Sequence, residues 1–191
     1  MGLRERKKAK TRSAIQSHAL RLFREQGYDA TTVQQIIQEA EVSESTFFRY
    51  FPTKADVVLF DDVDPLMVEA FRTQPPELSP LQALRGAFRD AFAQLSAQEI
   101  ADQMDRMQLS LSVPELRAVI LDQFAGAMQL LAEVLAERTG RRADDLSVST
   151  LAGAVVGVAI AVMFSIADDP TRDIVTLFDE SMACLDKGFD L

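Results

Sequence analysis

The sequence of 191 residues contains one cysteine, one histidine and no tryptophan, and these scarcities exclude several classes of site. A single cysteine cannot close an internal disulfide, and Cys184 and His18 do not form a metal-binding motif. The sequence has neither a glycine-rich phosphate loop nor a nucleophile elbow. We therefore expect no catalytic residue, no metal and no cofactor. Cys184 suits a reducing cytoplasm and an apolar helix position.

The sequence also lacks stretches in which apolar and polar residues alternate, so no strands are expected. Capping-box pairs recur instead, such as Ser79 with Gln82 and Ser96 with Glu99. We predict an all-α protein of about nine helices. The basic N-terminus runs into an amphipathic helix and not into an apolar segment, so we expect no signal peptide and a cytoplasmic location.

Charge is unevenly distributed along the chain, whose net charge is −9. Residues 1–56 hold ten Lys and Arg against seven Asp and Glu, a net charge of +3, which leaves −12 for residues 57–191. An acidic protein approaches phosphate only where its positive charge is concentrated. The N-terminal basic run is either a solvated tail or an arm that lies along a DNA backbone or in a minor groove. It consists of Arg4, Arg6, Lys7, Lys8, Lys10 and Arg12.

Residues 31–54 predict two short helices joined by a tight turn, with a third helix starting directly afterwards. Apolar residues at 33, 36, 37 and 40 define one face of the first helix, and Thr31 or Thr32 caps its start while the other faces outward. Ser43 is a good N-cap for the second helix, which Pro52 ends. The pattern is typical of a helix-turn-helix that spans about residues 32–51, although an ordinary buried helical hairpin gives a similar pattern.

Residues 9–60 resemble the DNA-binding domain of TetR-family transcriptional regulators. The resemblance lies in the run LFREQGYDATTV and in IIQEAEVSESTFFRYFPTKADVV. It implies an all-α homodimer with an N-terminal three-helix domain, residues 1–56, and a C-terminal ligand-binding and dimerisation domain, residues 57–191. It also implies that the dimer binds double-stranded operator DNA and releases it when a small-molecule effector binds.

The resemblance assigns phosphate contacts to Thr32, Tyr50 and Lys54, and contacts with bases or the adjoining backbone to the second helix of the motif. This chain departs from the family at Glu41, where glycine is frequent, and at Phe48, where tyrosine is frequent. Glu44 could accept from a cytosine amine or stabilise the helix N-terminus. The candidate DNA-binding residues are Arg4, Arg6, Lys7, Lys8, Lys10, Thr31, Thr32, Gln34, Ser43, Glu44, Ser45, Thr46, Phe48, Arg49, Tyr50 and Lys54.

The middle of the chain is expected to enclose the effector. One long helix over residues 54–72 is predicted to connect the two domains, and helices rich in Phe, Met and Leu follow it. Most of these apolar residues suit an ordinary core as well as a pocket. Asp102, Asp105 and Arg106 could point inward at a charged ligand, but each is expected mainly in solvent. The candidate pocket residues are Phe88, Phe92, Met104, Met107, Phe124 and Met128.

Residues 151–167 form an uncharged segment, LAGAVVGVAIAVMFSIA, with a GxxxG pattern at Gly153 and Gly157. The segment is short for a membrane span and has acidic flanks without an aromatic belt, so we favour a helix packed on its copy across a two-fold axis. The apolar stripe of the last helix would complete this interface. The candidate dimer residues are Gly153, Gly157, Phe178 and Met182.

Together these features predict a ligand-responsive repressor that binds a palindromic operator as a dimer and is released by a mainly apolar small molecule. The expected partners are operator DNA, the effector and a second copy of the chain, with no membrane. Two other hypotheses stay open: a membrane-tethered DNA-binding regulator, and a helical enzyme or carrier with an incidental helix-turn-helix.

Overall fold

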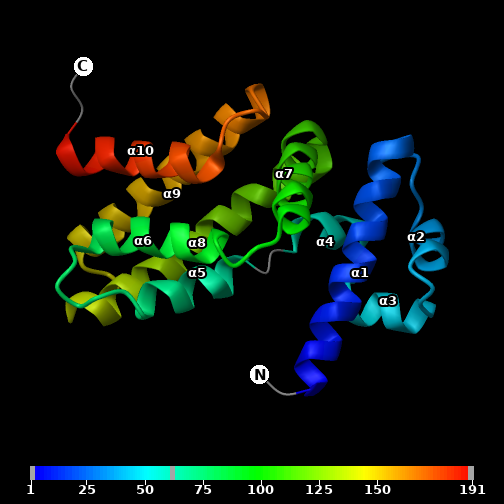
Figure 1. Ribbon diagram of the computed structural model, residues 1–191, viewed down its shortest axis with the longest axis horizontal. Helices are drawn as coiled ribbons and strands as arrows, with labels where there is room; N and C mark the ends of the chain where they lie inside the picture. The colour runs from blue at the N-terminus through cyan, green and yellow to red at the C-terminus, as the bar shows by residue number, and fades with distance from the viewer. Residues whose placement is uncertain (1–2, 61–62, 189–191) are drawn as a thin grey trace. The chain divides into compact units, whose positions relative to one another are not determined.

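The computed structural model describes residues 3–60 and 63–188, and the side chains of residues 3–6, 63–64 and 121–122 fall outside this description. Ten helices and no strand lie in the described part, as the predicted all-α class requires (Figure 1). The helices are α1 (Leu3–Gln26), α2 (Val33–Glu39), α3 (Glu44–Tyr50), α4 (Lys54–Leu59), α5 (Val63–Arg72), α6 (Pro80–Phe92), α7 (Ala97–Ser112), α8 (Pro114–Thr139), α9 (Leu146–Asp168) and α10 (Ile174–Lys187).

The described residues divide into two compact units. The first unit contains the chain up to Phe60 together with Ala101–Ala118, and the second contains the remaining described residues, from Val63 to Ile100 and from Val119 onward. Sequence reasoning placed a domain boundary at residue 56 and had no signal for the return of residues 101–118 to the first unit.

The core of the first unit joins α1–α4 to the end of α7 and the start of α8. Apolar residues recur on one face of each short helix, so a small bundle can bury them all. Leu116 of α8 is completely buried in this cluster, and Leu109 and Val113 pack against it. The buried members are Ile15, Ala19, Leu20, Phe23, Tyr28, Ile36, Ile37, Phe47, Phe51, Val57, Val58, Leu59 and Leu116.

The turn between α2 and α3 is a Schellman motif. The Val42 N–H donates to the Ile37 carbonyl over 3.2 Å, and the Glu41 N–H donates to the Gln38 carbonyl over 3.2 Å. Glu41 has φ of +52°, the left-handed conformation that glycine adopts without steric cost. This non-glycine residue therefore carries backbone strain at the centre of the helix-turn-helix.

The predicted single helix over residues 54–72 is wrong. α4 ends at Leu59 because Phe60 is extended, with φ of −68° and ψ of 122°. The buried Gln16 amide donates 3.0 Å hydrogen bonds to the carbonyls of Val57 and Phe60, which lack partners at the end of the helix. The Arg12 guanidinium also lies 4.1 Å from the centroid of the Phe60 ring. Side chains of α1 thus fix the end of α4.

Two polar contacts join α1 to α7 within the first unit. The Ser17 hydroxyl donates a 3.0 Å hydrogen bond to Asp102, which is buried, and Arg24 forms an ion pair with Asp105. The expectation that both carboxylates lie in solvent is therefore wrong for Asp102. A buried carboxylate requires hydrogen-bond partners, and its contact with Ser17 supplies one.

The second unit is built on α6, which packs against α5 and α10, while α10 also packs against α9. The predicted capping box of Ser79 and Gln82 opens α6. Arg85 of α6 pairs with Asp179 of α10 over 2.7 Å, which lowers the pKa of the Asp179 carboxyl. Arg138 of α8 donates to the carbonyls of residues 74, 75 and 78 and so holds the loop that precedes α6.

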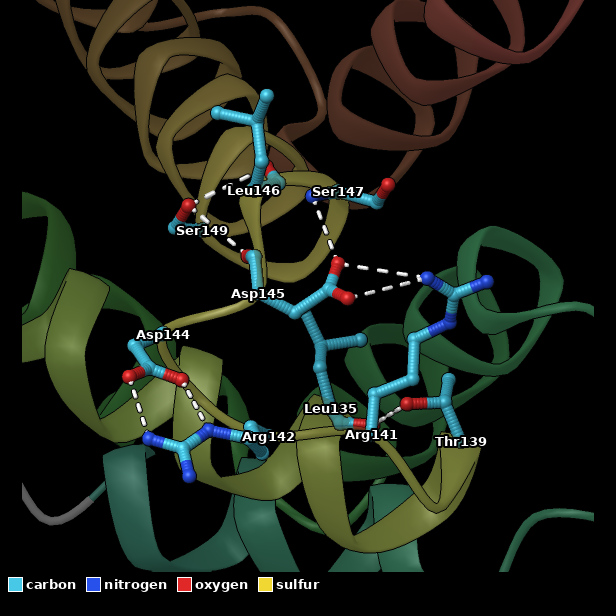
Figure 2. Close-up of polar contacts among 9 residues, drawn as sticks. All are labelled: Leu135, Thr139, Arg141, Arg142, Asp144, Asp145, Leu146, Ser147 and Ser149. Atoms are coloured by element: carbon cyan, nitrogen blue, oxygen red, sulfur yellow. Dashed lines mark hydrogen bonds and ion pairs between the residues drawn. The ribbon is translucent and has the colours of Figure 1, made fainter.

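Figure 2 shows the loop that leads from α8 into α9. Gly140 follows α8 with φ of +66°, as expected of a helix C-cap. The Asp145 carboxylate accepts from the Ser147 N–H over 2.9 Å and pairs with Arg141, and these contacts lower its pKa. Arg142 pairs with Asp144 over 2.7 Å. The loop thus fixes the first turn of α9.

α8 and α9 are each long and apolar enough to cross a membrane, by length and composition. An apolar helix at the core of a soluble protein satisfies the same criterion, so length and composition do not separate the two cases.

Candidate nucleic-acid interface

α3 begins at Ser43, the N-cap that the sequence predicted. Its side chain accepts a hydrogen bond of 3.2 Å from the Thr46 N–H, and its oxygen lies 3.1 Å from Ser45 Oγ. Ser43 also donates to Thr46 Oγ1 over 2.8 Å. Because its hydroxyl accepts from a backbone N–H that has no partner within the helix, Ser43 stabilises the start of α3.

The two faces of α3 differ in exposure. Phe47 and Phe51 are completely buried in the first unit, whereas Thr46 and Tyr50 are half-buried at the sides. At 100° per residue, Arg49 and Ser45 lie furthest from the buried face. The exposed face consists of Glu44, Ser45, Phe48 and Arg49.

The cationic and the acidic side chain of α3, Arg49 and Glu44, lie near opposite ends of the helix. The Arg49 guanidinium lies 5.1 Å from the centroid of the Tyr50 ring and remains exposed. Glu44 is the first residue of α3, where its negative charge is favourable to the helix macrodipole. This position agrees with the helix-stabilising hypothesis for Glu44 and does not test a contact with cytosine.

Of the two threonines before α2, one caps the helix and the other is buried. Thr32 is exposed and caps α2 in a capping box with Gln35. Thr31 is 2% exposed, and its hydroxyl donates to the Gly27 carbonyl over 2.8 Å. The threonine that does not cap the helix was expected to face outward. This expectation is wrong, since that residue is Thr31 and it faces the core. Gln34 is exposed on α2.

Lys54 is held by the protein. Its Nζ donates hydrogen bonds to the carbonyls of Tyr28, over 2.9 Å, and Thr31, over 3.2 Å, and lies 4.0 Å from the centroid of the Tyr28 ring. An ammonium has three donors, so these two bonds leave one for another acceptor. The contacts tie α4 to the loop between α1 and α2, and they position the surface beside α3.

Tyr28 is buried beneath this ammonium. Its hydroxyl has no hydrogen-bond partner among the described residues. Burial, and secondarily the negative charges of Glu115, Asp29 and Asp56, raise the pKa of the Tyr28 phenol to about 12.

The basic run is helical. α1 begins at Leu3, and among its described side chains, from Lys7 onward, Ile15 is the first that is completely buried. This segment forms the first turns of α1, and its contact with a DNA backbone or minor groove stays a prediction. Lys7, Lys8 and Lys10 are exposed there. Arg4 and Arg6 were also predicted to contact DNA, and their side chains lie outside the described residues.

The predicted pocket residues fall into both units. Met104 and Met107 lie in the first unit, and the other four lie in the second. Phe88 stacks on Phe92 at 4.5 Å between ring centroids and on Phe178 of α10 at 4.0 Å. Sequence reasoning did not connect Phe178 with this aromatic cluster. Phe124 is half-buried and Met128 is exposed on α8.

The predicted dimer residues also differ in their surroundings. Phe178 and Met182 are buried within the protomer, so their side chains have little surface to offer a partner. Gly157 is exposed, and Gly153 is half-buried beside Met128. Cys184 is exposed, contrary to the apolar position expected for it.

Sequence reasoning missed the residues whose role depends on contacts distant in the chain. Gln16 is a polar residue within the apolar stripe of α1, and this interruption was the available signal for its role at the end of α4. Nothing local marks Ser17 or Asp102, which lie 85 positions apart.

Comparison with known proteins places these features in a family. Residues 15–59 match the family model of bacterial regulatory proteins of the tetR family, and residues 78–190 match that of the MftR C-terminal domain. The HTH-type transcriptional regulator TcmR of Streptomyces glaucescens is 37% identical over 151 residues, which cover 75% of this chain and 67% of TcmR.

Two further similarities extend over most of the chain. The putative mycofactocin biosynthesis transcriptional regulator MftR of Mycobacterium tuberculosis is 28% identical over 167 residues, covering 82% of this chain and 79% of MftR. The crystal structure of FadR from Thermus thermophilus, a TetR-family repressor in complex with lauroyl-CoA, has a TM-score of 0.59 and 26% identity, covering 94% and 95% of the two chains. The chain therefore belongs to the TetR family of transcriptional regulators, DNA-binding proteins with an N-terminal helix-turn-helix domain and a C-terminal helical domain.

Proposed function

We propose that this regulator is a repressor, which binds a palindromic operator as a homodimer and releases it when a mainly apolar small molecule binds. The observation that carries the DNA-binding part is the outer face of α3. There a helix fixed by two buried phenylalanines exposes Ser45 and Arg49, groups that hydrogen-bond to base edges or phosphates.

The homodimer proposal rests on an exposed stripe of α9. This stripe lies opposite the buried residues of the helix, and its spacing of three and four residues suits packing against a second helix. Leu146 is 80% exposed at one end and Phe164 is 52% exposed near the other. Between them lie small residues that allow close approach of two helices. The stripe is formed by the exposed residues Leu146, Thr150, Gly157, Ala161 and Phe164 and by Ala154, which is half-buried.

The effector proposal rests on the apolar residues of the second unit and on the FadR complex. None of the four predicted pocket residues that lie in the second unit is ionisable, and an apolar ligand avoids the cost of burying charge against them. FadR of Thermus thermophilus binds lauroyl-CoA. A saturated acyl chain is therefore a suitable first probe of this class.

The helix predicted over residues 54–72 would have connected the two domains and could have carried the effector signal, but the structure divides it into α4 and α5. α7 is a better candidate, because it has residues in both units and contacts α1 through Asp102 and Asp105. Asp105→Asn should leave operator affinity nearly unchanged and should weaken the effect of the ligand on it.

The DNA-binding proposal is tested by selection of duplexes from a random pool. The full-length chain should enrich a palindrome with half-sites about 34–36 Å apart, or a multiple of that distance. Analytical ultracentrifugation should find an even number of chains per duplex. Failure to enrich any sequence would contradict the operator proposal.

The effector proposal is tested on the selected duplex with lauroyl-CoA, and coenzyme A is the control for the head group. Lauroyl-CoA should release the duplex, whereas coenzyme A should not. Release by coenzyme A alone would contradict an apolar effector. A cytoplasmic location, which we also propose, predicts that the protein remains in the supernatant without detergent.

A further inference from the structure

Phe48 is an unusual side chain for the surface of a DNA-binding unit. Among the described residues of the first unit it is the one large apolar side chain that is prominently exposed, at 44%. Its ring packs edge-on against the buried Phe47, with 5.3 Å between centroids and 90° between planes. The ring is thus exposed and at the same time held in a fixed position.

The chemistry of the ring limits what it can recognise. A phenyl group has no hydrogen-bond donor or acceptor, so it cannot read the polar edges of a base pair. In the major groove the apolar feature that differs between base pairs is the C5-methyl group of thymine. Ser45 and Arg49, exposed on the same helix, can supply polar contacts to neighbouring bases.

We infer that Phe48 is a specificity-determining residue, whose ring packs on the C5-methyl group of one thymine in each operator half-site. This inference rests on the proposed operator-binding function. The contact removes apolar area from water, and burial of one methyl group corresponds to about fourfold in affinity at each half-site. The two contacts in a palindrome together raise the affinity about 15-fold.

The experiment replaces the thymines of the selected duplex with deoxyuridine, one position at a time, and measures binding by fluorescence anisotropy. Deoxyuridine lacks only the methyl group. Wild type should lose about fourfold in affinity at one position per half-site. Phe48→Ala should bind the thymine and deoxyuridine duplexes equally. Phe48→Tyr should retain the methyl dependence, since it keeps the ring.

Arg49→Ala is the matched control, because it truncates another exposed residue of α3. It should bind more weakly while it still distinguishes thymine from deoxyuridine. The absence of a methyl-dependent position in wild type, or its persistence in Phe48→Ala, would overturn the inference and leave operator binding intact. If no sequence is selected at all, the proposed function itself fails, and the inference with it.

Discussion

Lys54 Nζ donates a 2.9 Å hydrogen bond to the carbonyl of Tyr28 and lies 4.0 Å from the centroid of its ring. The resemblance to TetR-family domains assigned this lysine to a phosphate. Its contacts show that it joins two elements of the DNA-binding unit. Its loss should therefore lower the stability of the fold, separately from any loss of a phosphate contact.

Replacement of Lys54 with Ala should lower the free energy of unfolding by about 1–3 kcal/mol, because it removes charge-assisted hydrogen bonds to two carbonyls. Urea denaturation monitored by circular dichroism measures this change. Lys8→Ala is the matched control, since Lys8 is exposed and its loss should alter stability by less than about 0.5 kcal/mol. Equal stability of Lys54→Ala and wild type would mean that the two hydrogen bonds of Lys54 contribute nothing to the free energy of unfolding.

Replacement of Glu41 with Gly should relieve the strain of a left-handed residue in the Schellman turn. The comparison with Glu41→Ala removes the effect of charge, because both variants lose the carboxylate. Glycine should be more stable than alanine here by roughly 1 kcal/mol. Chemical denaturation of the two variants measures the difference, and a more stable alanine variant would rule out the strain.

Tyr28 should make stability depend on alkaline pH. Its pKa is raised from an ordinary value near 10 to about 12, so the protonated phenol is favoured in the folded state. The contribution of the protonated Tyr28 phenol to the free energy of unfolding is complete below pH 10 and is lost as pH rises from about 10 through 12. The difference in unfolding free energy between wild type and Tyr28→Phe isolates this loss. A constant difference across that range would contradict burial of a neutral phenol.

Replacement of Lys7, Lys8 and Lys10 with Gln should reduce the salt dependence of operator binding. Each lost phosphate contact lowers the slope of log affinity against log salt by about 0.9. Lys187→Gln is the control, because Lys187 lies on α10 in the second unit. An unchanged slope in the triple variant would identify the basic start of α1 as a solvated segment.

Replacement of Gly157 with Leu should disrupt the dimer. Overpacking costs about 1–3 kcal/mol, and a two-fold interface would contain the substitution twice. Analytical ultracentrifugation should show dissociation, while Ser149→Leu, an exposed residue off the α9 stripe, should remain dimeric. A dimeric Gly157→Leu protein with intact operator affinity would place the interface elsewhere.

The sequence was most informative where structure is determined locally. Ser43 caps α3 as its spacing indicated, and the apolar periodicity correctly located Ile36 and Phe47 in the core. Such features depend on residues within one or two helical turns, so a single sequence contains the evidence for them.

Contacts between distant segments were not predictable in the same way. The end of α4 at Leu59 involves Gln16 of α1, 41 positions away in sequence from Val57, although Pro65 was a local signal against one continuous helix. Asp102 looked like a solvated carboxylate because its partner, Ser17, is remote in sequence. Phe178 suited an interface stripe equally well until its stacking on Phe88 placed it in the protomer core.

The most direct test of the account is competition between the selected operator and a scrambled duplex of equal length and composition at about 150 mM salt, where nonspecific phosphate binding is weakened. Wild type should prefer the operator by about 10³-fold or more. Arg49→Ala, which truncates an exposed cation of α3, should lose a large part of this preference. Equal affinity of wild type for both duplexes would contradict sequence-specific recognition through α3.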